Sequence, residues 1–131
     1  MGALWRSLTV AVATAALLAG TGAAVVLAQG EWAAPADAKA AKNPVKGIGG
    51  GKKSVETNCA SCHGSSGKGD GPAASALPTK PADWTSAKVQ AQTDGELFWK
   101  IANGRGAMPP WKHLPDKERW EIVNYIRTLK K

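Results

Sequence analysis

The chain has 131 residues, a length that allows one small domain and an extension of it. Seventeen lysine and arginine residues against ten acidic ones give a formal net charge of +7 at pH 7. A basic protein could bind nucleic acid, but this sequence contains no dense basic cluster with interleaved aromatic residues. We therefore expect no nucleic-acid partner, and we expect the positive charge to favour partner proteins with acidic docking surfaces.

The first 28 residues predict a targeting segment. From Leu8 to Ala28 the chain carries no charged side chain, and this run is long enough to span a bilayer. The run is rich in alanine, contains two glycines and ends in Val26-Leu27-Ala28, a small-residue pattern typical of signal-peptide cleavage. Residues 1–28 are thus either a cleaved signal peptide or a retained N-terminal membrane anchor. Both alternatives export the remainder of the chain.

Residues 29–46 are rich in alanine, lysine and proline and show no convincing apolar periodicity. This composition predicts a flexible linker between the leader and a domain formed by residues 47–131. If the leader is retained, Trp32 at the start of the linker is suited to contact with the membrane interface.

The five residues Cys59-Ala60-Ser61-Cys62-His63 contain both cysteines of the chain. The spacing Cys-x-x-Cys-His is typical of an attachment site for a c-type haem. Two thiols three positions apart lie on one helical turn, so both can add to the vinyl groups on one edge of a porphyrin. The next residue, His63, is then placed to donate a ring nitrogen to the iron.

Two other interpretations of this segment remain open. A disulfide between Cys59 and Cys62 would form a thioredoxin-like redox site, which expects a βαβ context, and no strand-like alternation surrounds the motif. A zinc site would need four ligands, and the two cysteines with His63 and His113 supply that number. Adjacent Cys62 and His63 are, however, poor partners on one tetrahedral ion.

Residues 64–81 predict a loop, because five glycines or prolines fall within residues 64–72 alone. We expect this loop to wrap one edge of a bound haem, where side chains would collide with the ring. A small domain with so much glycine is marginal unless a covalent cofactor supplies part of the core. After the loop, Trp84 suits either a hydrogen bond to a haem propionate or simple packing.

The second half of the domain predicts helices. A short helical turn is expected between Ser86 and Gln90. Thr93 and Glu96 have the spacing of a capping box, which predicts the start of a helix that ends at Asn103. Pro115 suits the first turn of a last helix, and the apolar stripe of that helix falls at i, i+3, i+4 and i+7, which are Ile122, Tyr125, Ile126 and Leu129.

Between these two helices lies Met108, the only methionine apart from Met1. A thioether sulfur is a soft, neutral ligand that favours ferrous iron. Gly104 and Gly106 let the backbone approach a haem, and the prolines after Met108 stiffen the loop. We expect Met108 to be the second axial ligand, with His113 as the alternative.

These features together resemble the class I, mono-haem cytochromes c. In that family a Cys-x-x-Cys-His motif ends the first helix and a Met-Pro ligand loop precedes the last one. The resemblance implies an all-α domain of three main helices and a short helix around one covalently bound haem c. His63 and Met108 would be the axial ligands.

The resemblance also implies details of packing. The first helix would cover residues 49–59, although several glycines make its start unfavourable by propensity. Ile122 and Tyr125 would pack where the last helix crosses the first at Gly51. The Gly71-Pro72 turn would hold the proximal imidazole through its carbonyl.

The function implied is single-electron transfer between periplasmic or membrane-bound redox partners. Such a protein is a carrier, or the cytochrome subunit of a larger oxidoreductase, and not itself an enzyme. The domain would be soluble in the periplasm or anchored to the outer face of the inner membrane. The alternative is a five-coordinate haem sensor or a peroxidase-like enzyme, although only Arg105 near Met108 offers a polar group.

Overall fold

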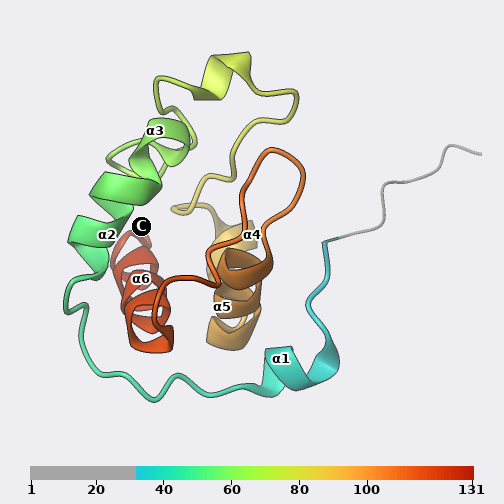
Figure 1. Cartoon of the computed structure of the whole chain (residues 1–131), viewed down its shortest axis with the longest axis vertical. Helices are drawn as coiled ribbons and strands as arrows, with labels where there is room; N and C mark the ends of the chain where they lie inside the picture. The colour runs from blue at the N-terminus through green and yellow to red at the C-terminus, as the bar shows by residue number, and fades with distance from the viewer. Residues whose placement is uncertain (1–31) are drawn as a thin grey trace, which may run out of the picture. The chain divides into compact units, whose positions relative to one another are not determined.

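The computed structural model describes residues 32–131, and within these residues the fold consists of helices and loops without a strand (Figure 1). The elements are α1 (Ala36–Ala40), α2 (Gly51–Asn58), α3 (Ala60–His63), the 3-10 turn η1 (Ala74–Ala76), α4 (Ala87–Gln90), α5 (Asp94–Asn103) and α6 (Asp116–Thr128). The all-α prediction is confirmed. No helix in this part of the chain is both long and apolar enough to cross a membrane. The leader predicted for residues 1–28 lies outside the described residues.

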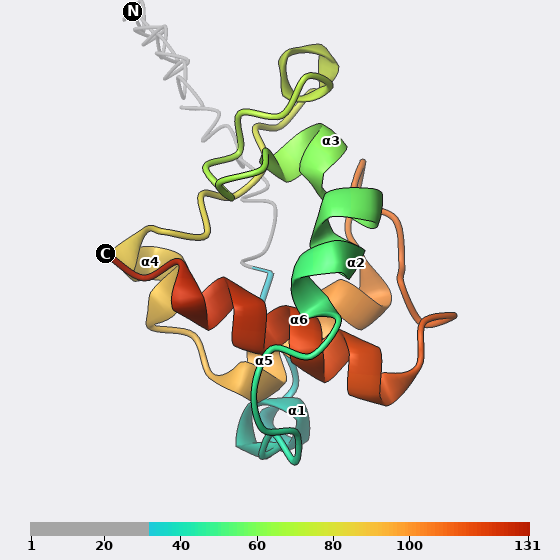
Figure 2. The same ribbon diagram turned by 90° about the vertical axis from the view of Figure 1, so that its left-hand side faces the viewer.

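Helices α2 and α6 cross at the centre of the fold (Figure 2). The approach is close because Gly51, in the first turn of α2, has no side chain where it meets the backbone of Glu121 and Ile122. The residues with the least exposed side chains surround this contact, and these are Val55, Ile122, Val123 and Ile126. The crossing that the resemblance implied at Gly51 is therefore present.

Helix α5 begins with the predicted capping box. The Thr93 hydroxyl accepts a hydrogen bond from the N–H of Glu96 (3.1 Å), and the Glu96 carboxylate accepts one from the N–H of Thr93 (2.8 Å). The helix ends where Gly104 takes a positive φ of 61°. Leu97 and Ile101 are buried in the same core as the α2–α6 crossing. The predicted short helix α4 is also present.

Three local details of the elements differ from the predictions. The predicted loop over residues 64–81 contains the 3-10 turn η1. Helix α6 begins at Asp116, because Pro115 has an extended ψ of 146° and precedes the helix as its cap. The first helix is also shorter than the predicted range 49–59, since the glycines before Gly51 form a turn. As a result Cys59 lies just after α2, and Cys62 and His63 lie on the separate short helix α3.

Residues 34–46 correct the prediction of a flexible linker, because they pack on the helices of the domain. Helix α1 lies against α5, where Gly95 has no side chain in the way of the Ala38 carbonyl. Further along, the Asn43 side-chain amide donates a hydrogen bond to the Asn124 side chain on α6 (2.8 Å). Contacts through glycine and asparagine require no apolar periodicity, and for this reason a periodicity argument did not reveal them.

Candidate functional site

Cys59, Cys62 and His63 lie on one turn where α2 passes into α3. The helix is interrupted at Cys59, whose N–H still donates to the carbonyl of Val55 (2.9 Å). The carbonyl of Cys59 accepts from the N–H groups of Cys62 (3.2 Å) and His63 (2.9 Å), which closes the next turn. Both cysteines are half-buried free thiols. The structure thus brings three of the four predicted site residues together.

The environment of Cys59 differs from that of a reactive dithiol. Burial, followed by the effect of the neighbouring Cys62, raises the pKa of the Cys59 thiol to about 11. Disulfide-exchange sites instead lower the pKa of one cysteine, because the thiolate is the attacking species. Cys59 also packs against the hydrophobic core. These observations argue against the thioredoxin-like interpretation.

The imidazole of His63 is buried and fixed in orientation. Its Nδ1 lies 3.2 Å from the carbonyl oxygen of Ala82, and the ring stacks on the indole of Trp84 with centroids 4.2 Å apart. A carbonyl can only accept, so Nδ1 carries the proton and the lone pair of Nε2 remains as a donor to a metal. Burial lowers the pKa of His63, and the hydrogen bond to Ala82 opposes this effect only in part. The lowered pKa keeps the ring neutral at pH 7.

The partner of His63 corrects one detail implied by the resemblance. The Ala82 carbonyl, and not the Gly71-Pro72 turn, accepts the hydrogen bond from Nδ1. Gly71 lies instead against the end of α3, where its N–H donates to the Cys62 carbonyl (3.1 Å). A side chain at Gly71 would meet the Ser61 carbonyl. The turn therefore supports the backbone that carries the motif. Trp84 stacks on His63, and a hydrogen bond from its indole to a haem propionate stays a prediction.

Met108 lies on the loop between α5 and α6. Its backbone exchanges two hydrogen bonds with Arg105, at 2.9 and 3.0 Å, which forms a tight turn. Just beyond the turn, the N–H of Trp111 donates to the Ile101 carbonyl (3.1 Å) and so ties the loop back to α5. Met108 is half-buried. In Figures 1 and 2 this loop and α3 rise toward the same end of the fold.

The zinc interpretation is wrong for this structure. Within residues 32–131 no group of three histidine, cysteine or acidic side chains is arranged to hold a metal ion. His113, the fourth ligand that a zinc site would need, is exposed and lies beside the ring of Trp111 with centroids 5.3 Å apart. A tetrahedral site needs all its protein ligands in reach of one ion.

The available donors fit a covalently held haem. Two free thiols on one turn match the two vinyl groups of a porphyrin, and the adjacent His63 offers a neutral ring nitrogen whose other nitrogen is held by a carbonyl. A loop constrained by backbone hydrogen bonds carries the thioether of Met108. Neutral nitrogen and sulfur donors are the axial ligands of low-spin haem carriers. Nothing in this donor set conflicts with a haem.

Two features of the fold were not identified from the sequence. One is the Ala82 carbonyl, for which a sequence contains no signal because every residue has a carbonyl. The other is Arg119, which is buried although it is charged. A signal for Arg119 was present, since it lies three residues before Ile122 and so falls on the buried face of α6.

A comparison with protein families adds independent evidence. The family model described as "Cytochrome C oxidase, cbb3-type, subunit III" matches residues 48–126. This range begins just before α2 and includes both parts of the predicted site. A comparison with curated proteins finds no match.

Two solved structures are similar to the chain. One is the "Kuenenia stuttgartiensis reducing HAO-like protein complex Kustc0457/Kustc0458", with 33% identity and a TM-score of 0.58, and the match covers 64% of this chain and 44% of that one. The other is the "KustC0563 c-type cytochrome", with 27% identity and a TM-score of 0.55, covering 62% of this chain and 98% of that one. The chain therefore matches nearly the whole of the second protein but less than half of the first.

Proposed function

The chain belongs to the family of cbb3-type cytochrome c oxidase subunit III, and on this premise we propose that it carries single electrons on one covalently bound haem c. Proteins of this kind are c-type cytochromes and transfer electrons. The number of haems follows from the sequence, since its two cysteines allow one Cys-x-x-Cys-His motif. When bound, the haem supplies an iron that changes its charge by one unit without making or breaking a substrate bond.

Four residues hold the haem in this proposal. Cys59 and Cys62 form the thioether bonds, and His63 and Met108 are the axial ligands. The observation that carries the proposal is the state of His63, which is buried, neutral and held through Nδ1 by the Ala82 carbonyl directly after two free thiols. A fixed ligand is useful to an electron carrier, because little reorganisation then accompanies each change of iron charge.

The partners proposed for the carrier are redox proteins with acidic docking surfaces. The loops on either side of the site carry exposed cations, and these are Lys68, Lys80, Arg105 and Lys112. Charges of one sign around a reactive edge speed the encounter with an oppositely charged partner. One similar structure is part of a protein complex, which supports a role as the cytochrome subunit of a larger oxidoreductase. We place the protein in the periplasm, soluble or held at the inner membrane.

An optical spectrum tests the carrier against the sensor or peroxidase alternative. The full chain is produced in a host that exports it and attaches haem, and acid–acetone extraction shows whether the haem is covalent. We expect covalent haem whose ferrous spectrum is unchanged by carbon monoxide, because both axial positions are closed. Ready binding of carbon monoxide would instead indicate an open iron and favour a sensor or peroxidase. Absence of covalent haem would refute the proposal as a whole.

Replacement of Met108 by alanine tests the second ligand. In Met108→Ala we expect covalent haem, an iron that binds carbon monoxide, and a lower reduction potential, because the soft thioether that favours ferrous iron is lost. The matched control is His113→Ala, which removes the alternative ligand from the same loop and should leave spectrum and potential unchanged. If the two variants exchange these results, His113 and not Met108 is the sixth ligand.

A further inference from the structure

Arg119 is a buried cation that the proposed haem chemistry does not yet use. The residue is 7% exposed, and its guanidinium carbon lies 4.5 Å from the centre of the Phe98 ring on α5. One terminal nitrogen donates to the carboxylate of Asp116. The Nε–H is fully buried and has no hydrogen-bond partner among the described residues. The cation is thus only partly compensated inside the fold.

The stability of the fold does not account for this arrangement. A buried N–H without a partner loses its hydration and gains nothing in return. The carboxylate of Asp116 is largely exposed, so it compensates the buried charge from the solvent side only. An apolar side chain of similar volume at this position would be at least as stabilising. Unsatisfied buried polar groups are rare in native structures and need an explanation, and a redox role is one such explanation.

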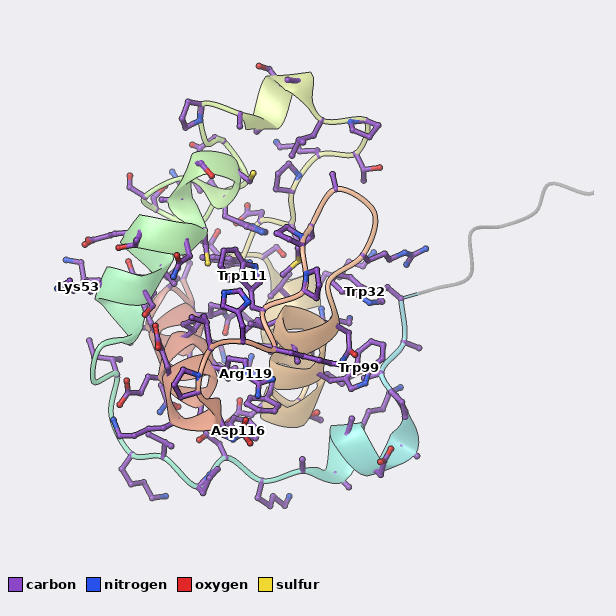
Figure 3. All side chains as sticks on the ribbon, in the orientation of Figure 1. Trp32, Lys53, Trp99, Trp111, Asp116 and Arg119 are labelled. Atoms are coloured by element: carbon purple, nitrogen blue, oxygen red, sulfur yellow. The ribbon has the colours of Figure 1, made fainter. Side chains whose placement is uncertain are left out.

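The position of Arg119 connects it to the haem site. Phe98, which its guanidinium covers, packs against the same hydrophobic core as Cys59, one of the two thiols that would bind the haem. Trp111, three residues after Met108, packs against this core as well. In the view of Figure 3 the labelled Arg119 and Trp111 both project between the ribbons of α6 and α5, and Trp111 is half-buried. Through Phe98, Arg119 therefore contacts the hydrophobic core against which Cys59 and Trp111 also pack.

We propose that Arg119 sets the reduction potential of the haem by placing an undercompensated positive charge in the shared core. Adding one electron to ferric iron lowers the charge of the site by one unit. A fixed cation in a medium of low dielectric stabilises the reduced state relative to the oxidised one. Arg119 thereby raises the potential, and it does so without contact with the iron. This inference rests on the proposed function, because it requires a covalently bound haem.

Charge-changing and charge-conserving variants of Arg119 separate electrostatics from packing. In Arg119→Gln we expect the equilibrium constant for haem reduction by a fixed redox couple to fall about tenfold. Arg119→Lys keeps the positive charge but loses the planar guanidinium. In this variant the equilibrium constant for haem reduction should stay close to that of the parent protein. Both variants lose the planar stacking of the guanidinium on Phe98. A purely structural role would therefore lower the midpoint of thermal unfolding in both, with no difference in potential between them.

Arg127 provides a matched control on the same helix. It also carries one positive charge and pairs with a carboxylate, Asp94, but it donates to the carbonyl of Gln90 as well and its side chain is 26% exposed. In Arg127→Gln we expect a change in the reduction equilibrium of about twofold or less, since solvent screens this charge. A shift as large as that of Arg119→Gln would mean that the effect follows net charge and not burial.

If Arg119→Gln does not accumulate as folded protein, a variant of its partner Asp116 provides the test. Asp116 is exposed, so Asp116→Asn should fold, and removal of the partner of Arg119 should shift the equilibrium toward the reduced state. Because solvent screens the exposed Asp116 carboxylate, this shift should be smaller than that of Arg119→Gln and opposite in direction. Equal potentials in the parent, Arg119→Gln and Arg119→Lys proteins, all with covalent haem, would overturn the inference but leave the proposed function intact. Failure of the parent to attach haem would instead be a failure of the proposed function.

Discussion

The α2–α6 crossing and the Met108 loop each depend on a glycine that lies against a neighbouring backbone. At the crossing, Gly51 faces the backbone of Glu121, and fully buried apolar side chains surround the contact. In the loop, Gly104 faces the Met108 carbonyl, with a positive φ of 61°, and exposed residues follow it. A glycine against a neighbouring backbone therefore allows close helix packing at the crossing, and in the loop it allows the turn that presents the Met108 side chain.

The difference between the two regions indicates where stability and ligand geometry originate. The crossing is held by apolar side chains that pack against one another. The loop is held by a few backbone hydrogen bonds, and its key side chain, Met108, is only half-buried. We expect changes at the crossing to alter the free energy of unfolding with little effect on the haem spectrum, and changes in the loop to do the opposite.

The largest effect is expected for Gly51→Ala. The added Cβ would overlap the Glu121 carbonyl, so α2 and α6 must separate and lose part of their packing. We expect a loss of about 3 kcal/mol in the free energy of unfolding. Guanidinium denaturation of the haem-loaded protein, followed by circular dichroism, measures it.

Gly50→Ala is the control for this change. Gly50 precedes Gly51, and a Cβ there would lie 3.6 Å from the Glu121 carboxylate, which is an ordinary contact. Its φ of −83° is open to any residue. We expect a change within about 0.5 kcal/mol. A similar loss in both variants would mean that the cap at the start of α2, and not the crossing, determines the effect.

A smaller loss of stability, but a larger effect on the haem, is expected for Gly104→Ala. The Cβ would overlap the Met108 carbonyl and displace the turn that presents the sulfur. We expect about 1–2 kcal/mol of destabilisation, mainly from the positive φ, together with partial opening of the iron to carbon monoxide. Ferrous spectra recorded with and without carbon monoxide report the opening.

Gly106 offers a control that isolates backbone strain. Its φ of 55° is also positive, but a Cβ at Gly106 would meet no atom within 4 Å. Gly106→Ala should therefore lose a similar amount of stability through strain while its iron stays closed. If carbon monoxide binds to both variants equally, the strained turn and not the overlap with Met108 controls the ligand.

Much of this architecture followed from local sequence signals. The capping box at Thr93 and Glu96, the stop at Gly104 and the apolar stripe of α6 all depend on neighbours within a few residues, and each is present in the structure. The family resemblance supplied the crossing at Gly51. The motif residues Cys59 to His63 were expected on one turn for the same local reason, and the structure has them there.

The features that sequence reasoning missed depend on contacts between distant segments. The packing of residues 34–46 relies on a glycine at Gly95 and on the amide of Asn43, and neither forms a periodic pattern. The carbonyl that holds His63 belongs to Ala82, nineteen residues away, and backbone groups have no sequence signature. Met108 remains a prediction as a ligand, since its role depends on an iron that the chain alone does not place.

The smallest change in stability is expected at a carboxylate of the crossing, Glu121. A change there should affect the crossing and leave the Met108 loop unaltered. Glu121 accepts hydrogen bonds from the Lys117 ammonium and from the Gly50 N–H (3.0 Å) at the start of α2. These two hydrogen bonds lower the pKa of Glu121 below its usual value of 4.5, and the bond from Lys117 has the larger effect. Lys53 and Glu118 line the same groove between α2 and α6.

The pH dependence of unfolding tests this carboxylate through Glu121→Gln. A lowered pKa in the folded state stabilises the fold fully above pH 4.5, and this contribution is lost as pH falls through the folded-state pKa. The parent should therefore be more stable than Glu121→Gln at pH 7, and the difference should shrink below pH 4.5. Other carboxyl groups with a lowered pKa, such as that of Glu96, are present in both proteins, so their contributions cancel in the stability difference. Because Glu121 lies at the crossing and not in the Met108 loop, the haem spectra of both proteins should agree at pH 7. A difference in unfolding free energy that stays constant from pH 7 to pH 3 would contradict the ionic role of Glu121.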